Sequence, residues 1–179
     1  RGLIPDWLYF SIFCPPIDVN DDGSVVLAPN GIRKIEAALL DYGFQRGDII
    51  VAHPEYMEKV VGSNTKVVGI AETDPLGIAP ATSAFTGVLG GEAYMAIKFR
   101  ELLNNPAIKK FKPKIVVGGP GAWQLESGEI RKEFGIDCVL VGEGEGVAGS
   151  IFEKAVNGEA LPEIVHGELV SEDEIPIIK

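Results

Sequence analysis

Two short apolar runs that end in glycines constrain the fold of this chain more than any other feature. Lys114–Trp123 reads KIVVGGPGAW and Asp137–Gly146 reads DCVLVGEGEG, with a helix-like segment between them. Apolar runs of this length, bounded by glycine, are typical of buried parallel strands. Glycines at the carboxyl end of a strand leave the backbone open to a ligand, because no Cβ stands in the way. Open α/β sheets bind ligands at that edge, so the two runs predict a parallel sheet with a ligand site at its carboxyl edge.

The rest of the sequence alternates between strand-like and helix-like segments. Strands are expected over Leu8–Cys14, Asp48–Ala52, Lys66–Ala71, Ile115–Val117 and Cys138–Val141. Helices are expected over Gly31–Tyr42, Tyr56–Val61, Glu92–Leu103, Ser127–Phe134 and Val147–Val156, and a long loop over Glu72–Gly91. This alternation indicates βαβ units and therefore an α/β fold with a five-stranded parallel sheet. A flavodoxin-like, three-layer arrangement with the strand order 2-1-3-4-5 fits this pattern.

Length and composition indicate one compact folding unit. The 179 residues are 46% hydrophobic and 23% charged, which is enough to bury a core. The formal charge of −10 argues against a nucleic-acid partner, since phosphate binding needs clustered Lys and Arg. No apolar run approaches the ~20 residues of a membrane span, so a cytoplasmic protein without membrane contact is expected. Residues 1–160 should form the domain, and the acidic residues 161–179 a linker or edge extension of a longer chain.

The two cysteines do not indicate a metal site. Cys14 and Cys138 have no metal-binding spacing, and we expect them at opposite sheet edges, which argues against a disulfide. An iron–sulfur cluster needs three or four thiolates and cannot be built from this chain alone.

The succession VVGGPG, a helix, FGIDCVLVGEGEG and a further helix resembles the amino-terminal cobalamin-binding-like domain of radical SAM enzymes. In that family a strand ending in Gly-Gly is followed, one helix later, by an Asp-x-x-x-x-Gly-Glu-Gly-Glu strand exit. The matching residues are Gly118, Gly119, Asp137, Gly142, Glu143, Gly144 and Glu145. The resemblance covers most of the chain, from Leu8 to Gly158.

The resemblance implies an accessory domain that binds cobalamin and catalyses nothing by itself. Its partner would be a radical SAM catalytic barrel of the same protein, which holds a [4Fe–4S] cluster and S-adenosylmethionine. The CxxxCxxC motif of that barrel does not occur in this sequence. An alternative is a degenerate domain that keeps the fold, binds no cofactor, and caps the barrel or contacts its substrate.

The resemblance also places candidate residues around the cofactor. The tail of cobalamin would lie between the sheet and its helices, where Gly118 and Gly119 leave room. Thr73 and Ser83 would offer hydroxyls to the tail or its phosphate, and the loop from Pro15 would face the corrin. The remaining candidates of the cofactor site are Pro16, Pro120, Gly142, Glu143 and Gly144.

Histidine is the weak point of the cobalamin hypothesis. Domains of this kind that place a histidine under cobalt use Asp-x-His-x-x-Gly after the first strand, and neither His53 nor His166 fits. His53 follows the expected second strand at the ligand edge, and imidazole can bind cobalt. A lone histidine before a proline is nevertheless more often a turn residue, so His53 is only a weak metal candidate.

The same loops also bear on other functions. Gly144–Gly149 matches the dinucleotide pattern G-x-G-x-x-G, but it follows the last expected strand, and Glu143 and Glu145 would repel a pyrophosphate. These two acids could form a catalytic pair. A role at the start of the next helix, or in a contact between domains, fits them better. The Pro-Pro-Ile-Asp loop after the first expected strand argues against a flavin phosphate site.

Overall fold

A four-stranded parallel sheet forms the centre of the molecule. A computed structural model describes residues 8, 12 and 17–171 of the chain. The strands are β1 (Val67–Ala71), β2 (Lys114–Gly118), β3 (Cys138–Gly142) and β4 (Ile164–Gly167). They lie in the order β1-β2-β3-β4, and each neighbouring pair is parallel. The expected α/β class and the parallel sheet are therefore confirmed.

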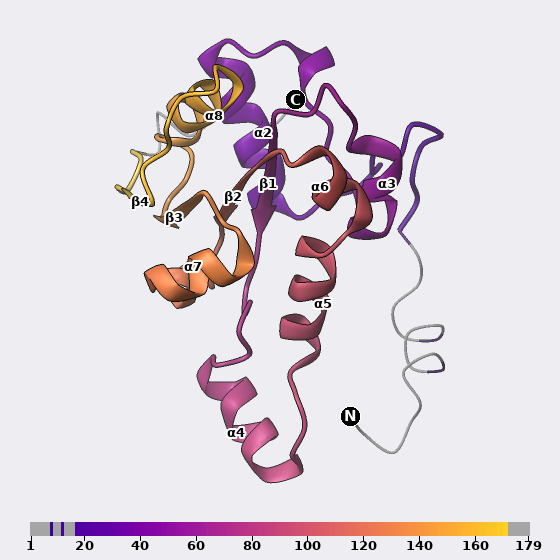
Figure 1. Ribbon diagram of the computed structural model, residues 1–179, viewed down its shortest axis with the longest axis vertical. Coiled ribbons are helices and arrows are strands. Elements are labelled where there is room, and N and C mark those ends of the chain that lie inside the picture. The colour runs from indigo at the N-terminus through magenta and orange to yellow at the C-terminus, as the bar shows by residue number, and fades with distance from the viewer. Residues whose placement is uncertain (1–7, 9–11, 13–16, 172–179) are drawn as a thin grey trace.

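Helices connect and flank the strands (Figure 1). The α-helices are α2 (Asn30–Tyr42), α3 (Met57–Val60), α4 (Pro80–Leu89), α5 (Tyr94–Leu103), α6 (Pro106–Phe111), α7 (Gly128–Phe134) and α8 (Ala148–Val156). Short 3-10 helices are η1 (Arg46–Asp48), η2 (Pro54–Tyr56) and η3 (Ala122–Leu125). Local signals explain several of these bounds. For example, Asn105 caps α6 by accepting a hydrogen bond from the Ala107 N–H at 2.9 Å, and Pro106 occupies the first turn.

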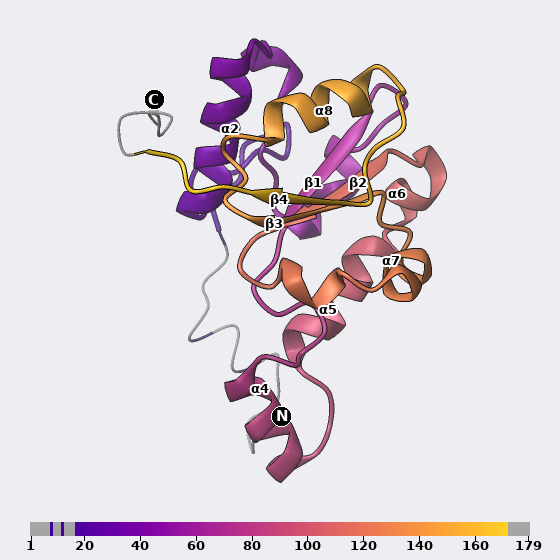
Figure 2. The ribbon, with the colours of Figure 1, turned by 90° about the vertical axis from the view of Figure 1, so that its left-hand side faces the viewer.

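Both faces of the sheet are buried. Successive side chains of a strand point to opposite faces, so Ile115 and Val117 join one hydrophobic core and Val116 joins the other. Figure 2 shows α2 and α8 on one side of the sheet and α5, α6 and α7 on the other. This two-sided burial explains why the strands read as continuous apolar runs.

The first two expected strands, Leu8–Cys14 and Asp48–Ala52, are not part of the observed sheet among the described residues. Asp48–Ala52 forms no ladder within the described residues, so the prediction of a strand there is wrong. Asp48 belongs to η1, and Ala52 makes only an isolated antiparallel bridge with Ser24. A strand exists only beside a neighbour, and the neighbour expected here, Leu8–Cys14, lies mostly outside the described residues. Its two described residues, Leu8 and Ile12, are helical.

The segment after residue 160 contributes β4 to the sheet. Val139 in β3 donates its N–H to the Glu163 carbonyl at 3.0 Å, and the β4 ladder continues to Gly142 and Gly167. Glu163 also forms an ion pair with the buried Arg131 of α7. The part of residues 161–179 that the structure describes therefore packs on the domain as an edge strand.

Helix α4 lies inside the segment that the sequence predicted to be a long loop. It projects beyond the carboxyl ends of the strands, away from α2 and α8 (Figures 1 and 2). Phe85 and Val88 on this helix are 69% and 84% exposed. No residue between Pro75 and Gly91 carries a charge. The result is an uncharged, apolar arm next to the expected ligand edge.

Candidate functional site

The parallel register brings the strand exits to one edge, as the sequence predicted. Ala71 at the end of β1 lies beside Gly118 of β2, and Gly142 at the end of β3 lies beside Gly167 of β4. The loops that carry most of the candidate residues therefore start from the same edge of the sheet.

The space that two glycines after β2 leave open is filled by the protein's own backbone. Gly119 has φ +95°, and a Cβ placed on it would lie 2.7 Å from the Glu72 carbonyl oxygen and 2.8 Å from the Glu72 nitrogen. A Cβ on Gly121 would collide with the Thr73 carbonyl. The Gly121 N–H also donates to the Glu72 carbonyl at 2.9 Å. These glycines let the exits of β1 and β2 touch, so the space they leave is filled.

Gly118 differs from both of them. Its φ is not positive, and a Cβ there would be 3.6 Å from the Cβ and the carbonyl oxygen of Leu140, an ordinary contact. Within the described part of the chain, nothing else lies within 4 Å of that position. Of the glycines at this exit, Gly118 is the one whose missing side chain is not replaced by other backbone.

The exit of β3 is closed by the chain that follows β4. Gly142 has φ +90°, and a Cβ on it would lie 2.6 Å from the Gly167 carbonyl oxygen. The Glu143 carboxylate accepts a hydrogen bond from the Val170 N–H at 3.1 Å. Glu143 therefore holds the segment after β4 in place.

The next residues of this loop face α2. Glu145 lies 3.5 Å from Lys34, and a Cβ on Gly144 would lie 2.9 Å from the Ile35 side chain. Gly149 sits against the ring of Tyr42. The G-x-G-x-x-G match thus allows α2 to approach the start of α8, which explains its glycines without a dinucleotide.

Asp137, from the motif that carries the resemblance, also has a structural partner. Its carboxylate accepts from Lys114 Nζ at 2.7 Å and from the Ile115 N–H at 2.8 Å. These bonds join the starts of β2 and β3, at the edge opposite the glycine exits.

A buried polar pair after β1 was missed by sequence reasoning. Asp74 and Gln124 are each 5% exposed, and Gln124 Nε2 donates to Asp74 Oδ1 at 2.8 Å. The Ala79 N–H donates to the same oxygen at 3.0 Å, and the Leu76 N–H donates to Gln124 Oε1 at 2.9 Å. Asp74 Oδ2 is buried and makes no hydrogen bond of ordinary geometry within the described residues. The Asp74–Gln124 pair therefore joins the residues that precede α4 to η3, which contains Gln124.

The pKa values of the two acids after β1 are shifted in opposite directions. Burial alone would raise the pKa of Asp74, but its interactions with the Thr82 and Gln124 side chains and hydrogen bonds from backbone N–H groups lower it below its ordinary value. Burial raises the pKa of Glu72, although the Thr73 N–H donates to its carboxylate at 2.9 Å. Asp74 is therefore held as an anion, whereas Glu72 takes up a proton more readily than a free glutamate.

The remaining candidates lie in different positions. Thr73 and Pro120 are exposed at the carboxyl edge, and Ser83 is exposed on α4. Pro15 and Pro16 lie outside the described residues.

His53 has a turn role in the structure. It precedes η2, and its Nδ1 accepts a hydrogen bond from the Glu55 N–H at 3.3 Å. Among residues 17–171 and the two described before them, no group of three or more His, Cys, Asp and Glu side chains could hold a metal ion.

Comparison with protein-family models, curated proteins and solved structures gives no significant match. In the part of the chain that the structure describes, no helix has the length and apolar character needed to cross a membrane.

Proposed function

We propose that this chain is an accessory domain that binds cobalamin at the carboxyl edge of its sheet and serves a radical SAM catalytic domain. The observation that carries the proposal is Gly118. It lies at the middle of the ligand edge, between the exits of β1 and β3, and its side-chain space is not taken by other backbone. The loop after β1, whose last residue Ala71 pairs with Gly118, adds the exposed residue Thr73 with its hydroxyl. The [4Fe–4S] cluster and S-adenosylmethionine would belong to the catalytic domain, in a cytoplasmic protein.

A flavodoxin-like sheet with a fifth strand beside β1 is part of this proposal; the full order 2-1-3-4-5 would also need Asp48–Ala52, which forms no ladder among the described residues. The Lys66 carbonyl and the Glu72 N–H both form hydrogen bonds with β2. Because backbone groups of successive residues in a strand point in alternate directions, those of Val67, Gly69 and Ala71 point away from β2, to the other side of β1. That side of β1 has no strand beside it among the described residues. Residues 8–14 would complete the sheet there, and Leu8 and Ile12 would have to leave their helical conformation.

A second candidate is a domain of the same fold that binds no cofactor and contacts a partner domain. Two observations favour it. The spaces at Gly119, Gly121 and Gly142 are filled by the protein itself. The α4 arm exposes Phe85 and Val88 without any charge nearby in sequence, as expected of a surface that packs on another domain.

The direct test is incubation of the protein with hydroxocobalamin, followed by gel filtration and a visible spectrum. A coloured protein peak with shifted corrin bands is expected. Gly118→Val should weaken binding at least about tenfold while the circular dichroism stays unchanged, because a strand tolerates valine there. Gly47→Val, at a glycine with open space around it, is the matched control. A colourless peak from folded protein would exclude the first candidate and favour the second.

A further inference from the structure

Five exposed lysines gather where α3 and α6 meet the amino ends of β1 and β2. We call Lys59, Lys66, Lys109, Lys110 and Lys112 the lysine patch. Lys59 lies in α3, which packs against α6, and Lys109 and Lys110 lie in the last turn of α6 (Figure 1). Lys66 and Lys112 precede the two strands, whose starts are joined by a hydrogen bond from the Lys114 N–H to the Lys66 carbonyl at 2.9 Å. The patch thus forms at the edge of the sheet opposite the glycine exits.

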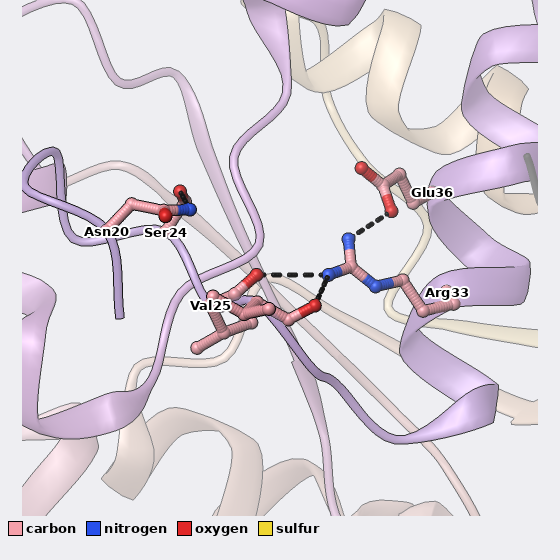
Figure 3. A network of polar contacts seen from close by, with 6 residues as sticks. Asn20, Ser24, Val25, Arg33 and Glu36 are labelled. Atoms are coloured by element: carbon pink, nitrogen blue, oxygen red, sulfur yellow. Dashed lines mark hydrogen bonds and ion pairs between the residues drawn. The ribbon is translucent and has the colours of Figure 1, made fainter. Parts of the chain in front are cut away.

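The five lysines of the patch have no carboxylate partner among the described residues, whereas six other basic residues do. Arg33 binds Glu36 at 2.7 Å and also reaches the Val25 carbonyl (Figure 3). Ion pairs also join Lys34 to Glu145, Lys98 to Glu101, Arg100 to Glu92, Lys114 to Asp137 and Arg131 to Glu163. No patch lysine forms an ion pair with any described residue, although the chain has 26 acidic and only 16 basic residues. No acid occurs between Leu102 and Leu125, so α6 and the start of β2 contain no carboxylate of their own, and Asp137, which reaches this edge from β3, is already paired with Lys114.

The backbone at Lys112 gives an independent observation. Lys112 ends α6 in the left-handed conformation, with φ 51° and ψ 51°. Among the described residues it is the one non-glycine with a positive φ. Glycine is the usual residue at such a helix end, because a Cβ is strained there. A strained position that keeps a charged side chain points to a use for that charge.

Favourable interaction of lysines with helix carboxyl ends does not explain the whole patch. It accounts for Lys59, Lys109 and Lys110, which lie in last turns. It does not account for Lys66, which precedes a strand, nor for a lysine at residue 112 where glycine would fit better.

We propose that the lysine patch docks a carboxylate-rich segment of a different protein. Charge complementarity favours this partner over a second copy of the chain. A two-fold contact centred on the patch would place one positive patch on another, and a head-to-tail contact closes into a defined oligomer only if its rotation allows a ring. A short acidic segment is also favoured over nucleic acid, since the formal charge of −10 repels a polyanion that extends beyond the patch. The inference stands apart from the cobalamin proposal, because the patch and the glycine exits lie at opposite edges.

The test uses the whole chain and a fluorescein-labelled oligoglutamate peptide, with binding followed by fluorescence anisotropy at low and physiological ionic strength. Binding that weakens with salt is expected. The triple variant K109E/K110E/K112E should bind at least about tenfold more weakly. The matched control is R46E/K132E/K154E, which changes the formal charge equally at three exposed basic residues without ion pairs in the described structure. It should keep most of the binding.

Three outcomes would overturn the proposal: no binding at low salt, equal weakening in both triple variants, or tighter binding of a DNA duplex than of the peptide. Lys112→Gly gives a second measurement that does not depend on charge reversal. It should weaken peptide binding about twofold, because one exposed charge is lost. At the same time it should raise the urea midpoint, because it relieves the left-handed backbone. A variant that loses stability as well as binding would mean that the lysine serves the fold.

Discussion

Replacing Gly119 by alanine should destabilise the protein, whereas the same change at Gly118 should not. The two glycines are neighbours at the exit of β2, and at each of them the substitution replaces one Cα hydrogen by a methyl group. A difference between the two variants therefore reports the backbone conformation and the contacts of each position. At Gly119 the φ of +95° is one that L-residues rarely adopt, and the strain costs roughly 1–2 kcal/mol. The new Cβ would also lie 2.7 Å from the Glu72 carbonyl oxygen, which forces the exit of β1 to move. Overpacking of this kind costs about 1–3 kcal/mol.

The sum predicts a loss of about 3 kcal/mol for Gly119→Ala, a large share of the ~5–15 kcal/mol that stabilises a typical domain. At Gly118 the nearest atoms are 3.6 Å from the Cβ position and φ is not positive, so no strain is expected. Alanine reduces the freedom of the unfolded chain, which leaves Gly118→Ala within about 0.5–1 kcal/mol of the wild type and on the stabilising side.

Urea denaturation followed by tryptophan fluorescence measures both free energies of unfolding, with equal m-values as the check that the transition is unchanged. If the two variants differ by less than about 0.5 kcal/mol, contact with Glu72 is not what requires glycine at 119. The spaces at the β2 exit would then be open to a ligand, and the structural explanation given for Gly119 would be wrong.

Two further predictions follow from shifted pKa values. Burial raises the pKa of the Cys138 thiol to about 11, so little of it is present as the reactive thiolate. In a Cys14→Ser variant, the native protein at pH 8 should therefore not react with a thiol reagent until urea unfolds it. Rapid reaction without urea would contradict this. Glu72→Gln should raise the urea midpoint at pH 7, because a carboxyl whose folded pKa is raised loses stability as pH rises through that value. Its advantage should shrink as the pH falls, because the wild-type carboxyl takes up a proton more readily in the folded state, and an advantage independent of pH would exclude burial of charge as the cause.

The strands with glycine exits were predictable because they are buried on both faces. Residues 115–117 and 138–141 are uninterrupted apolar runs, and the structure has β2 and β3 there. Asp48–Ala52 carries a similar signal but forms no ladder, since strand formation depends on a neighbour that local sequence does not contain. Helix α4 was missed because its threonines, valine and glycine are weak helix formers, and because Ala79, the residue before it, is bonded to Asp74 from outside the helix.

The candidate site could be predicted only in part. The sequence showed that glycines matter at the exits of β2 and β3, but a glycine gives the same signal whether a ligand or a neighbouring strand fills its space. That distinction depends on how closely β1 approaches β2, a distance set by tertiary packing. The Asp74–Gln124 pair joins residues 50 positions apart, so no local pattern could have indicated it.

Strand β4 has a consequence for how the domain can be produced. It covers the backbone of β3, whose Val139 is fully buried, and the Glu143 carboxylate fixes the residues that follow it. A protein shortened to residues 1–160 would expose that row of N–H and C=O groups along an apolar strand, which is a template for pairing between molecules. Such a product should aggregate, whereas one that continues past Val170 should remain soluble. A segment that reads as a trailing linker thus protects the domain against self-association.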